Sequence, residues 1–128
     1  MTRQVLAVDL KDDPAVVAAY TAHHERVWPE VLHSLQRAGI EDMQIYMLGR
    51  RLVMIVDTAE GVDFRRCFAA HVVSHPRVAE WEALMKGMQQ PPPDASAGEW
   101  WAVMQPVFRL GDGEARTTAA RQGSARPV

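Results

Sequence analysis

The segment DMQIYMLGRRLVMIVD, residues 42–57, decides the fold that this sequence predicts. Two β-rich runs, 42–48 and 51–57, flank the pair Gly49-Arg50, and this arrangement is typical of a β-hairpin. Side chains alternate between the two faces of a strand, and both faces of each run are largely apolar. The two stripes of the first run are Met43/Ile45/Met47 and Gln44/Tyr46/Leu48. A sheet built on this hairpin therefore needs a cover on each of its faces.

The residues before the hairpin predict a strand and a long helix. Residues 4–10, QVLAVDL, alternate enough to form a strand. Asp13 can cap a helix that begins at Pro14, because a missing N–H costs nothing at that position. The helical pattern continues to about residue 38. Gly39 is a typical helix end.

The residues after the hairpin predict helix, loop and a last strand. Residues 62–74 and 76–88 form two helical stretches that are separated at a proline. Residues 89–99, QQPPPDASAGE, predict a loop, because three successive prolines fit neither a helix nor a central strand. Residues 100–110 predict a last strand, with Pro106 at an edge or a bulge.

The order of these elements is β-α-β-β-α-β, which predicts an α+β fold of the ferredoxin-like kind: one antiparallel sheet with helices on one face. We expect a single domain over residues 1–110 and a disordered tail over 111–128, which has almost no large apolar residue. The second apolar face of the sheet needs another subunit or a ligand in a shallow cup. We expect a homodimer with sheets packed face to face, a barrel-like assembly.

The composition excludes several classes of protein. The chain has 128 residues, of which 48% are hydrophobic and 23% charged, and its net charge of -2 gives no electrostatic basis for binding nucleic acid or an anionic membrane. No apolar run approaches the roughly 18 residues of a transmembrane helix. The N-terminal residues do not predict a signal peptide. The single cysteine, Cys67, excludes an internal disulfide and indicates a cytoplasmic location.

The first helix carries two adjacent histidines, and the apolar spacing separates their roles. Apolar residues repeat every three or four positions along one face, with a gap at position 24. The members of this stripe are Val17, Tyr20, Val27, Trp28, Val31 and Leu35. His24 fills the gap, whereas His23 lies about 100° away, with the solvent-facing residues. Tyr20, His24 and Trp28 are therefore predicted to face the sheet along one edge of the helix.

Two interpretations of His24 stay open on the pattern alone. A histidine on an apolar stripe can be a core residue with satisfied hydrogen bonds, or a proton-transfer group that titrates near neutral pH. Tyr20 adds a second proton-bearing group, Trp28 adds a flat aromatic wall of the kind that stacks on sugars, and Pro29 kinks the helix beside them. These neighbours favour proton-transfer chemistry without a cofactor.

The other candidate groups give weaker signals. The motifs GxSxG and HExxH and a Gly-rich phosphate loop are absent. His71 and His75 have the spacing of a metal-binding pair, but no third ligand is evident, and a surface pair is favoured. Cys67 is expected to be an inert, packed thiol. The sequence therefore predicts neither a metal nor an organic cofactor.

With these residues identified, the chain resembles the L-rhamnose mutarotase family over residues 3–110. The resemblance depends most on the motif Tyr20-x3-His24-x3-Trp28-Pro29-Glu30. The other similar segments are Gly39, IYM at 45–47, EWEALM at 80–85 and VFRL at 107–110. The chain looks most like the members that act as L-fucose mutarotases, which carry similar LKDDP, GIEDM, EWEALM and GExW segments.

The resemblance implies a dimeric enzyme that interconverts the α and β anomers of a 6-deoxy-L-hexose, with L-fucose ahead of L-rhamnose. It implies that His24 is the acid/base and that Tyr20 binds the sugar. L-rhamnose-type members have a tyrosine at the position of Met43 and two tandem tryptophans at the positions of Trp81 and Glu82. The departures at Met43 and Glu82 imply a different pattern of sugar hydroxyls. Fucose-type members are expected to have larger residues around 86–88, so the exact sugar stays open.

The remaining residues of the predicted sugar site surround these groups. Trp81 and Trp28 would cover the apolar face of the sugar, although packing beneath the site is an equal alternative for Trp28. Glu82, Gln89 and Trp101 would orient hydroxyl groups. Trp101 alternates with the preceding tryptophan along a strand, so only one of the two can face the pocket.

Two other functions remain as alternatives on the sequence. A cofactor-independent monooxygenase of the dimeric ferredoxin-like type would also use a histidine, a tryptophan and an apolar cup, although its pocket would be wholly apolar. A non-catalytic small-ligand-binding domain would bind sugar without exchanging its anomers. Fold alone does not separate these functions.

Overall fold

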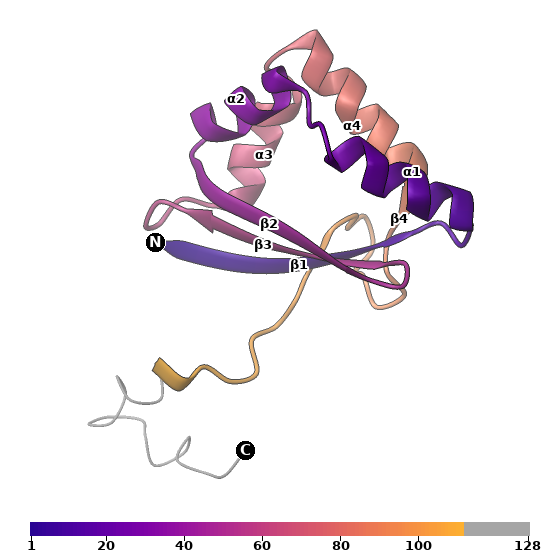
Figure 1. Ribbon diagram of the computed structural model, residues 1–128. Coiled ribbons are helices and arrows are strands. Elements are labelled where there is room, and N and C mark those ends of the chain that lie inside the picture. The colour runs from indigo at the N-terminus through magenta and orange to yellow at the C-terminus, as the bar shows by residue number, and fades with distance from the viewer. Residues whose placement is uncertain (112–128) are drawn as a thin grey trace.

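The computed structural model describes residues 1–111 and shows an antiparallel sheet with four helices on one face (Figure 1). The strands are β1 (Thr2–Leu10), β2 (Ile40–Leu48), β3 (Arg51–Thr58), β4 (Gln89–Gln90) and β5 (Ala102–Val103). The helices are α1 (Pro14–His24), α2 (Pro29–Arg37), α3 (Phe64–Val72) and α4 (Pro76–Met88). None of the helices in this part of the chain has the length and apolar character that a membrane span requires. Residues 112–128 of the predicted tail lie outside the described residues.

The hairpin predicted from residues 42–57 is confirmed as β2 and β3. Leu48 pairs with Arg51, and the turn between them uses Gly49, whose φ of 61° lies in the left-handed region. The strand order is β2-β3-β1-β4, and β5 pairs with the same edge of β1 as β4 does. All of these pairs are antiparallel. This order, with the helices on one face, confirms the predicted ferredoxin-like α+β fold.

The prediction of one helix over residues 14–38 is wrong, because the structure has two helices separated at residues 25–28. Pro29 is the cause. A proline disfavours the α conformation of the residue before it, and Trp28 is extended, with a φ of -61° and a ψ of 137°. Pro29 then begins α2 at a position where its missing N–H costs nothing. The end of α2 at Gly39, whose φ is 104°, is as predicted.

The predicted last strand over residues 100–110 is wrong in extent. Only β5 pairs with β1, and residues 104–109 have no regular structure. Pro106 lies in this irregular segment and has no N–H to donate to a neighbouring strand. The edge of β1 is instead shared between β5 and β4, and β4 comes from residues that were predicted to be loop. Two short strands therefore replace one long one.

The buried core lies between the helices and the sheet, in two clusters. The first consists of Val8, Leu10, Tyr20, Val31, Leu52, Val78, Trp81, Met85 and Met88. The second consists of Leu6, Ile40, Met54, Val56, Phe64 and Cys67. Two predicted site residues, Tyr20 and Trp81, belong to the first cluster, so core packing fixes their positions. Cys67 is a buried free thiol.

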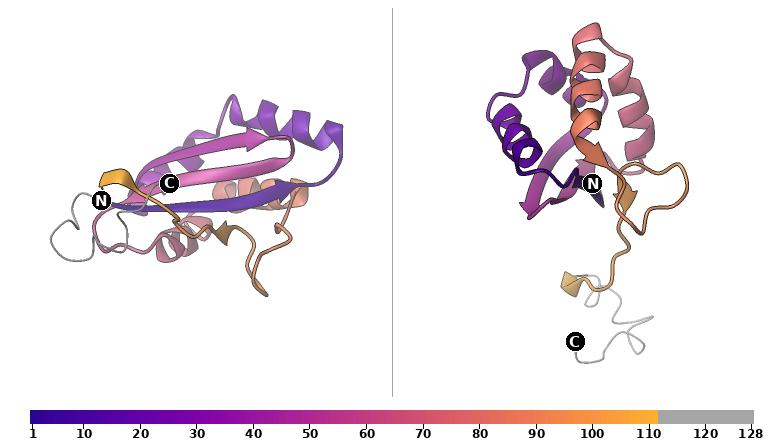
Figure 2. Two further views of the ribbon diagram at one scale, coloured as in Figure 1. Left: turned by 90° about the horizontal axis from the view of Figure 1, so that it is seen from below. Right: turned by 90° about the vertical axis from the view of Figure 1, so that its right-hand side faces the viewer.

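None of the helices α1–α4 lies on the opposite face of the sheet (Figure 2). Tyr46 and Leu48 point to this face, and they are 59% and 85% exposed. Arg3 and Asp57 lie opposite each other on the same face and form two hydrogen bonds, of 2.7 and 2.9 Å. The face therefore combines exposed apolar side chains with a paired charge.

Candidate active site

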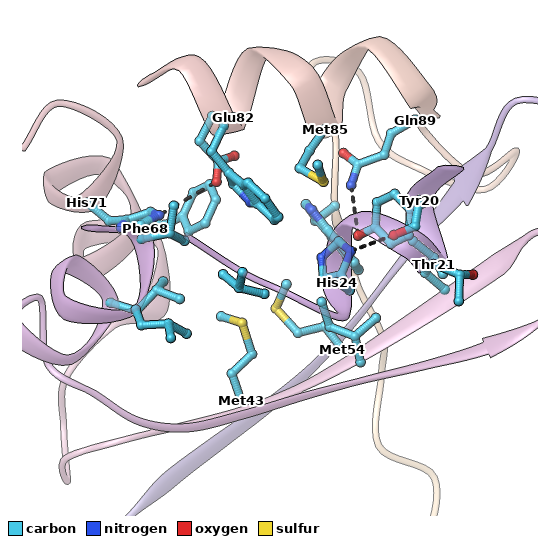
Figure 3. Close-up of a pocket in the computed structure, with 18 of the residues that line it drawn as sticks. Tyr20, Thr21, His24, Met43, Met54, Phe68, His71, Glu82, Met85 and Gln89 are labelled. Atoms are coloured by element: carbon cyan, nitrogen blue, oxygen red, sulfur yellow. Dashed lines mark hydrogen bonds and ion pairs between the residues drawn. The ribbon is translucent and has the colours of Figure 1, made fainter. Parts of the chain in front are cut away.

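A cavity of about 560 Å³ lies between the helices and the face of the sheet that they cover (Figure 3). Side chains from β2 and β3 supply an apolar floor: Met43, Ile45, Met47, Leu52 and Met54. The polar groups come mostly from the helices: Tyr20, Thr21, His24, Glu25, His71, Glu82 and Gln89. An apolar floor beneath several polar groups suits a small ligand with an apolar face and hydroxyl groups. The cavity lies on the helix side, so a ligand in it would not cover the open face of the sheet.

His24 is the last residue of α1, and its half-buried ring lines the cavity. Its Nδ1 lies 2.9 Å from the carbonyl oxygen of Tyr20. A carbonyl oxygen only accepts, so Nδ1 carries the proton and the neutral ring keeps its lone pair on Nε2. Burial is the largest influence on the ring and lowers the pKa of His24 below its ordinary value of 6.5. At neutral pH, His24 is therefore an uncharged imidazole whose Nε2 can accept a proton.

The hydroxyl of Tyr20 ends a chain of hydrogen bonds that begins at Trp100. The Trp100 Nε1–H donates to Gln89 Oε1 at 2.9 Å, and Gln89 Nε2 donates to the Tyr20 hydroxyl oxygen at 3.4 Å. The Tyr20 oxygen is an acceptor in this chain, so its own proton remains for donation to a ligand. Burial raises the pKa of Tyr20 to about 12. Tyr20 is therefore a hydrogen-bond donor that stays protonated at neutral pH.

Trp81 forms the aromatic wall of the cavity and separates it from Trp28. The Trp81 ring is buried, and its centroid lies 5.4 Å from that of His24 in an edge-on arrangement. Trp28 packs edge-on against Trp81 with a centroid separation of 5.1 Å, and the Arg77 guanidinium lies 3.7 Å from the centroid of the Trp28 ring. His23, predicted to face solvent, is half-buried near Trp81, with a centroid separation of 6.3 Å. Trp28 and His23 therefore contact Trp81 without lining the cavity.

Glu82 faces a histidine that the sequence analysis assigned to the surface. Glu82 Oε1 lies 3.6 Å from His71 Nε2, and His71 is only 1% exposed. The predicted surface pair of His71 and His75 is wrong, because α3 ends at Val72 and His75 caps the start of α4. Among residues 1–111, no group of three or more histidine, cysteine, aspartate or glutamate side chains could hold a metal ion.

The cavity brings together all the predicted site residues except Trp28. They are Tyr20, His24, Met43, Trp81, Glu82, Gln89 and Trp101. Of the two tandem tryptophans, Trp101 lines the cavity and Trp100 lies behind it, bonded to Gln89. Trp28 does not line the cavity, and its extended backbone forms the break before Pro29.

Two residues at this site, His71 and Trp100, were not predicted from the sequence. His71 continues an apolar stripe on α3 that includes Phe64 and Cys67, four and seven residues before it. The same spacing argument that selected His24 would have selected His71. Trp100 had no such signal, because its role depends on a side-chain hydrogen bond to Gln89 in another element.

Comparison with known proteins shows which family the chain is similar to. The model of the L-rhamnose mutarotase family matches residues 3–110. A protein from Xanthomonas campestris pv. campestris named L-fucose mutarotase is 39% identical over 127 residues, which cover 98% of each chain. A protein from Leptothrix cholodnii named L-rhamnose mutarotase is 26% identical over 98 residues, which cover 75% of this chain and 88% of its own. Both relatives thus carry the name of a mutarotase, which is a carbohydrate isomerase.

One solved structure supports the fold. The crystal structure of an L-rhamnose mutarotase from Formosa agariphila superposes on this chain with a TM-score of 0.61 and 19% identity, covering 86% of this chain and 99% of its own. The predicted fold and the predicted family are both confirmed, and with the family the prediction of a mutarotase. Since the family match extends over residues 3–110, the chain belongs to the L-rhamnose mutarotase family.

Proposed function

We propose that the chain interconverts the α and β anomers of a 6-deoxy-L-hexose, with L-fucose preferred to L-rhamnose. The observation that carries this proposal is the His24 ring, which is held by the Tyr20 carbonyl with its Nε2 lone pair available at the cavity. The preference for L-fucose is supported by the relative named L-fucose mutarotase, which is 39% identical, against 26% for the relative named L-rhamnose mutarotase. Polar groups in the cavity favour a hydroxylated ligand over the aromatic substrate of a monooxygenase.

The reaction needs one proton to move between two oxygen atoms on the same carbon. His24 Nε2 takes the proton of the anomeric hydroxyl, the bond from C1 to the ring oxygen breaks, and the new imidazolium returns the proton to that ring oxygen. Rotation about the C1–C2 bond turns the other face of the aldehyde to the ring hydroxyl. The same steps in reverse then close the ring as the other anomer. No electron leaves the sugar, so proton transfer accounts for the whole reaction.

Tyr20 would hold the sugar rather than exchange a proton with it. A phenol whose pKa is about 12 remains protonated throughout the reaction. Its hydroxyl, which accepts from Gln89, is therefore a fixed donor to a sugar oxygen. Gln89 and Trp100 restrict the direction of that hydroxyl.

The rest of the cavity matches the two kinds of surface on a 6-deoxy sugar. Trp81, Met43 and Trp101 would cover the apolar side of the ring and its methyl group. Glu82 would accept hydrogen bonds from hydroxyl groups on the opposite side. We assign Trp28 to packing behind Trp81, because it does not line the cavity.

We also infer that two copies of the chain form a homodimer. Tyr46 and Leu48 leave apolar surface on the open face of the sheet. Val107 and Phe108, which are 97% and 57% exposed, expose further apolar surface in the segment after β5. Large exposed apolar side chains of this kind support an interface with another chain. The cytoplasmic location that Cys67 indicates stays a prediction.

The test of the proposed function is anomer exchange measured by saturation-transfer NMR with L-fucose, L-rhamnose and D-glucose. We expect the wild-type protein to accelerate the exchange of L-fucose most. His24→Ala should lose about 10²–10⁴-fold of the acceleration, because the proton-transfer group is gone. His33→Ala, which removes an exposed histidine on α2, is the matched control and should keep the wild-type rate.

The outcomes separate the parts of the proposal. Acceleration that is greatest for L-rhamnose would overturn the sugar preference only. Acceleration that survives in His24→Ala would overturn the assignment of the acid/base. If the wild-type protein accelerates none of the three sugars, the proposed substrate class is wrong.

A further inference from the structure

His71 is a buried histidine that the proposed mechanism does not use. It lines both the main cavity and a second cavity of about 370 Å³ between α2 and α3. Its Nε2 is the one buried side-chain nitrogen or oxygen atom in residues 1–111 that has no hydrogen-bond partner. The ring is directed toward Glu82, whose Oε1 lies 3.6 Å from Nε2 (Figure 3). A buried polar atom without a partner calls for an explanation.

The other side of the His71 ring is held by two serines. Ser34 Oγ lies 2.7 Å from His71 Nδ1 and 2.7 Å from Ser74 Oγ, and Ser74 Oγ donates to the His71 carbonyl oxygen at 2.8 Å. These three contacts need three protons, and the two hydroxyl groups supply only two. The third proton is therefore on His71 Nδ1, which donates to Ser34, while Ser34 donates to Ser74.

The position of that proton determines what faces Glu82. With Nδ1 protonated, Nε2 of a neutral ring would direct a lone pair at the carboxylate of Glu82. Two acceptors that face each other without a donor are unfavourable in a buried site. A proton on His71 Nε2 would remove the conflict, and the 3.6 Å contact with Glu82 Oε1 would then join opposite charges as an ion pair. The serines thus fix the ring, and the ring fixes the carboxylate.

We propose that His71 is a positioning residue that holds the Glu82 carboxylate so that it accepts hydrogen bonds from sugar hydroxyl groups. The inference rests on the proposed mutarotase function. The two nitrogens of the His71 ring face Ser34 and Glu82, so we assign His71 to act through Glu82, which lines the cavity. Loss of the contact should therefore weaken sugar binding and raise KM. Proton transfer at His24, and with it kcat, should change little.

Two amide substitutions separate the two sides of the His71 ring. A glutamine places its amide nitrogen near the position of Nε2, and an asparagine places its own near Nδ1. His71→Gln should keep the contact with Glu82 and leave KM for L-fucose within about twofold of the wild type. His71→Asn should keep the contact with Ser34 only, and raise KM about 10-fold with kcat within about twofold. His33→Asn is the control for an exposed histidine and should change neither constant.

A double-mutant cycle tests whether His71 acts through Glu82. Glu82→Gln should raise KM as His71→Asn does, and the two changes together should raise it no further than Glu82→Gln alone. Independent effects that multiply in the double mutant would overturn the proposal. So would a His71→Asn variant whose kcat falls while its KM stays unchanged.

A measurement without sugar keeps this test separate from the proposed function. The ¹⁵N NMR signals of the His71 ring should show a proton on Nδ1 in the wild type and in Glu82→Gln, with a much larger shift of the Nε2 signal than of the Nδ1 signal between the two. The contact between His71 and Glu82 would be overturned by a wild-type ring without a proton on Nδ1. It would also be overturned by an Nε2 signal that does not shift in Glu82→Gln, even if the enzyme is active. If the protein exchanges no anomers but Nε2 shifts, the pairing holds and the proposed function fails.

Discussion

His24 shows how one backbone hydrogen bond sets the chemistry of a residue. His24 Nδ1 donates to the Tyr20 carbonyl oxygen, which lies one helical turn before it. The tautomer that results leaves Nε2 as the basic atom. The ring is packed against Trp81 and Tyr20 and also lines the cavity, so the core role and the acid/base role are compatible, and the acid/base role stays a prediction.

The lowered pKa of His24 predicts the pH dependence of anomer exchange. A base is active when it has lost its proton, so kcat/KM should be constant between about pH 7 and 8. It should fall on acidification, with a midpoint below the ordinary value of 6.5, because burial disfavours the charged ring. His23, whose charge also lowers the pKa of His24, should move the midpoint upward when changed to alanine. Initial rates of anomer exchange across the pH range measure the midpoint in the wild type and in the His23 variant. A wild-type midpoint above 6.5 would contradict the assignment of His24 as the base.

Tyr20→Phe tests the hydroxyl group without removing the buried ring. The substitution deletes the donor to the sugar and leaves Gln89 Nε2 without its acceptor. We expect kcat/KM to fall about 10-fold, the effect of about one lost hydrogen bond in the transition state. The other tyrosine, Tyr46, is 59% exposed on the open face of the sheet, so Tyr46→Phe is the matched control. If Tyr20→Phe and the wild type have equal activity, the Tyr20 hydroxyl does not bind the sugar.

At the scale of the element, the break at Pro29 decides which residues reach the cavity. A continuous helix would place Trp28 four residues after His24 on the same face. Because Trp28 is extended, the first helix ends before it and α2 begins at Pro29 as a separate helix. His24 then becomes the last residue of α1, at the cavity, while Trp28 packs behind Trp81 and under Arg77.

The start of α1 depends on a side-chain cap that can be tested directly. Asp13 Oδ1 accepts from the Ala15 N–H at 2.9 Å, and so satisfies one of the unpaired donors at the helix start. Asp13→Ala should lower the free energy of unfolding by about 1 kcal/mol, measured by denaturant titration. Asp12→Ala, which removes the neighbouring exposed carboxylate, should have a much smaller effect. If both variants lose a similar free energy of unfolding, the lost negative charge is responsible and not the lost helix cap.

At the scale of the whole molecule, the sheet has one face covered by helices and one that is open (Figure 2). The cavity uses the covered face, so the open face is left for the proposed dimer. The segment after β5 runs away from the helices and carries exposed apolar side chains. A second copy would bury both surfaces and remove them from water.

The dimer predicts a measurable mass and a variant that reduces it. Light scattering after size-exclusion chromatography should give twice the chain mass of 14.3 kDa. Phe108→Asp should shift the protein toward the single-chain mass, because a carboxylate at an apolar interface loses its hydration. Val73→Asp is the control, since Val73 is 80% exposed on the helix side of the molecule. A wild-type protein with the mass of one chain would contradict the dimer.

The sequence by itself determined the features that depend on neighbours along the chain. Alternation and a Gly-containing turn predicted the β2–β3 hairpin. Helical spacing selected His24 over His23, and capping residues predicted the start at Pro14 and the stop at Gly39. These features follow from local dihedral preferences and from the periods of helix and strand, which are visible in a single sequence.

The tertiary structure alone decided the features that depend on residues far apart in sequence. His71 opposes Glu82 and is held by Ser34, 37 residues before it, and Trp100 reaches Tyr20 through Gln89. The short strands β4 and β5 depend on pairing with one edge of β1, which is distant from them in sequence. Spacing predicts which face a residue shares with its neighbours. It does not predict which side chain of another element lies opposite, because that depends on how the elements pack.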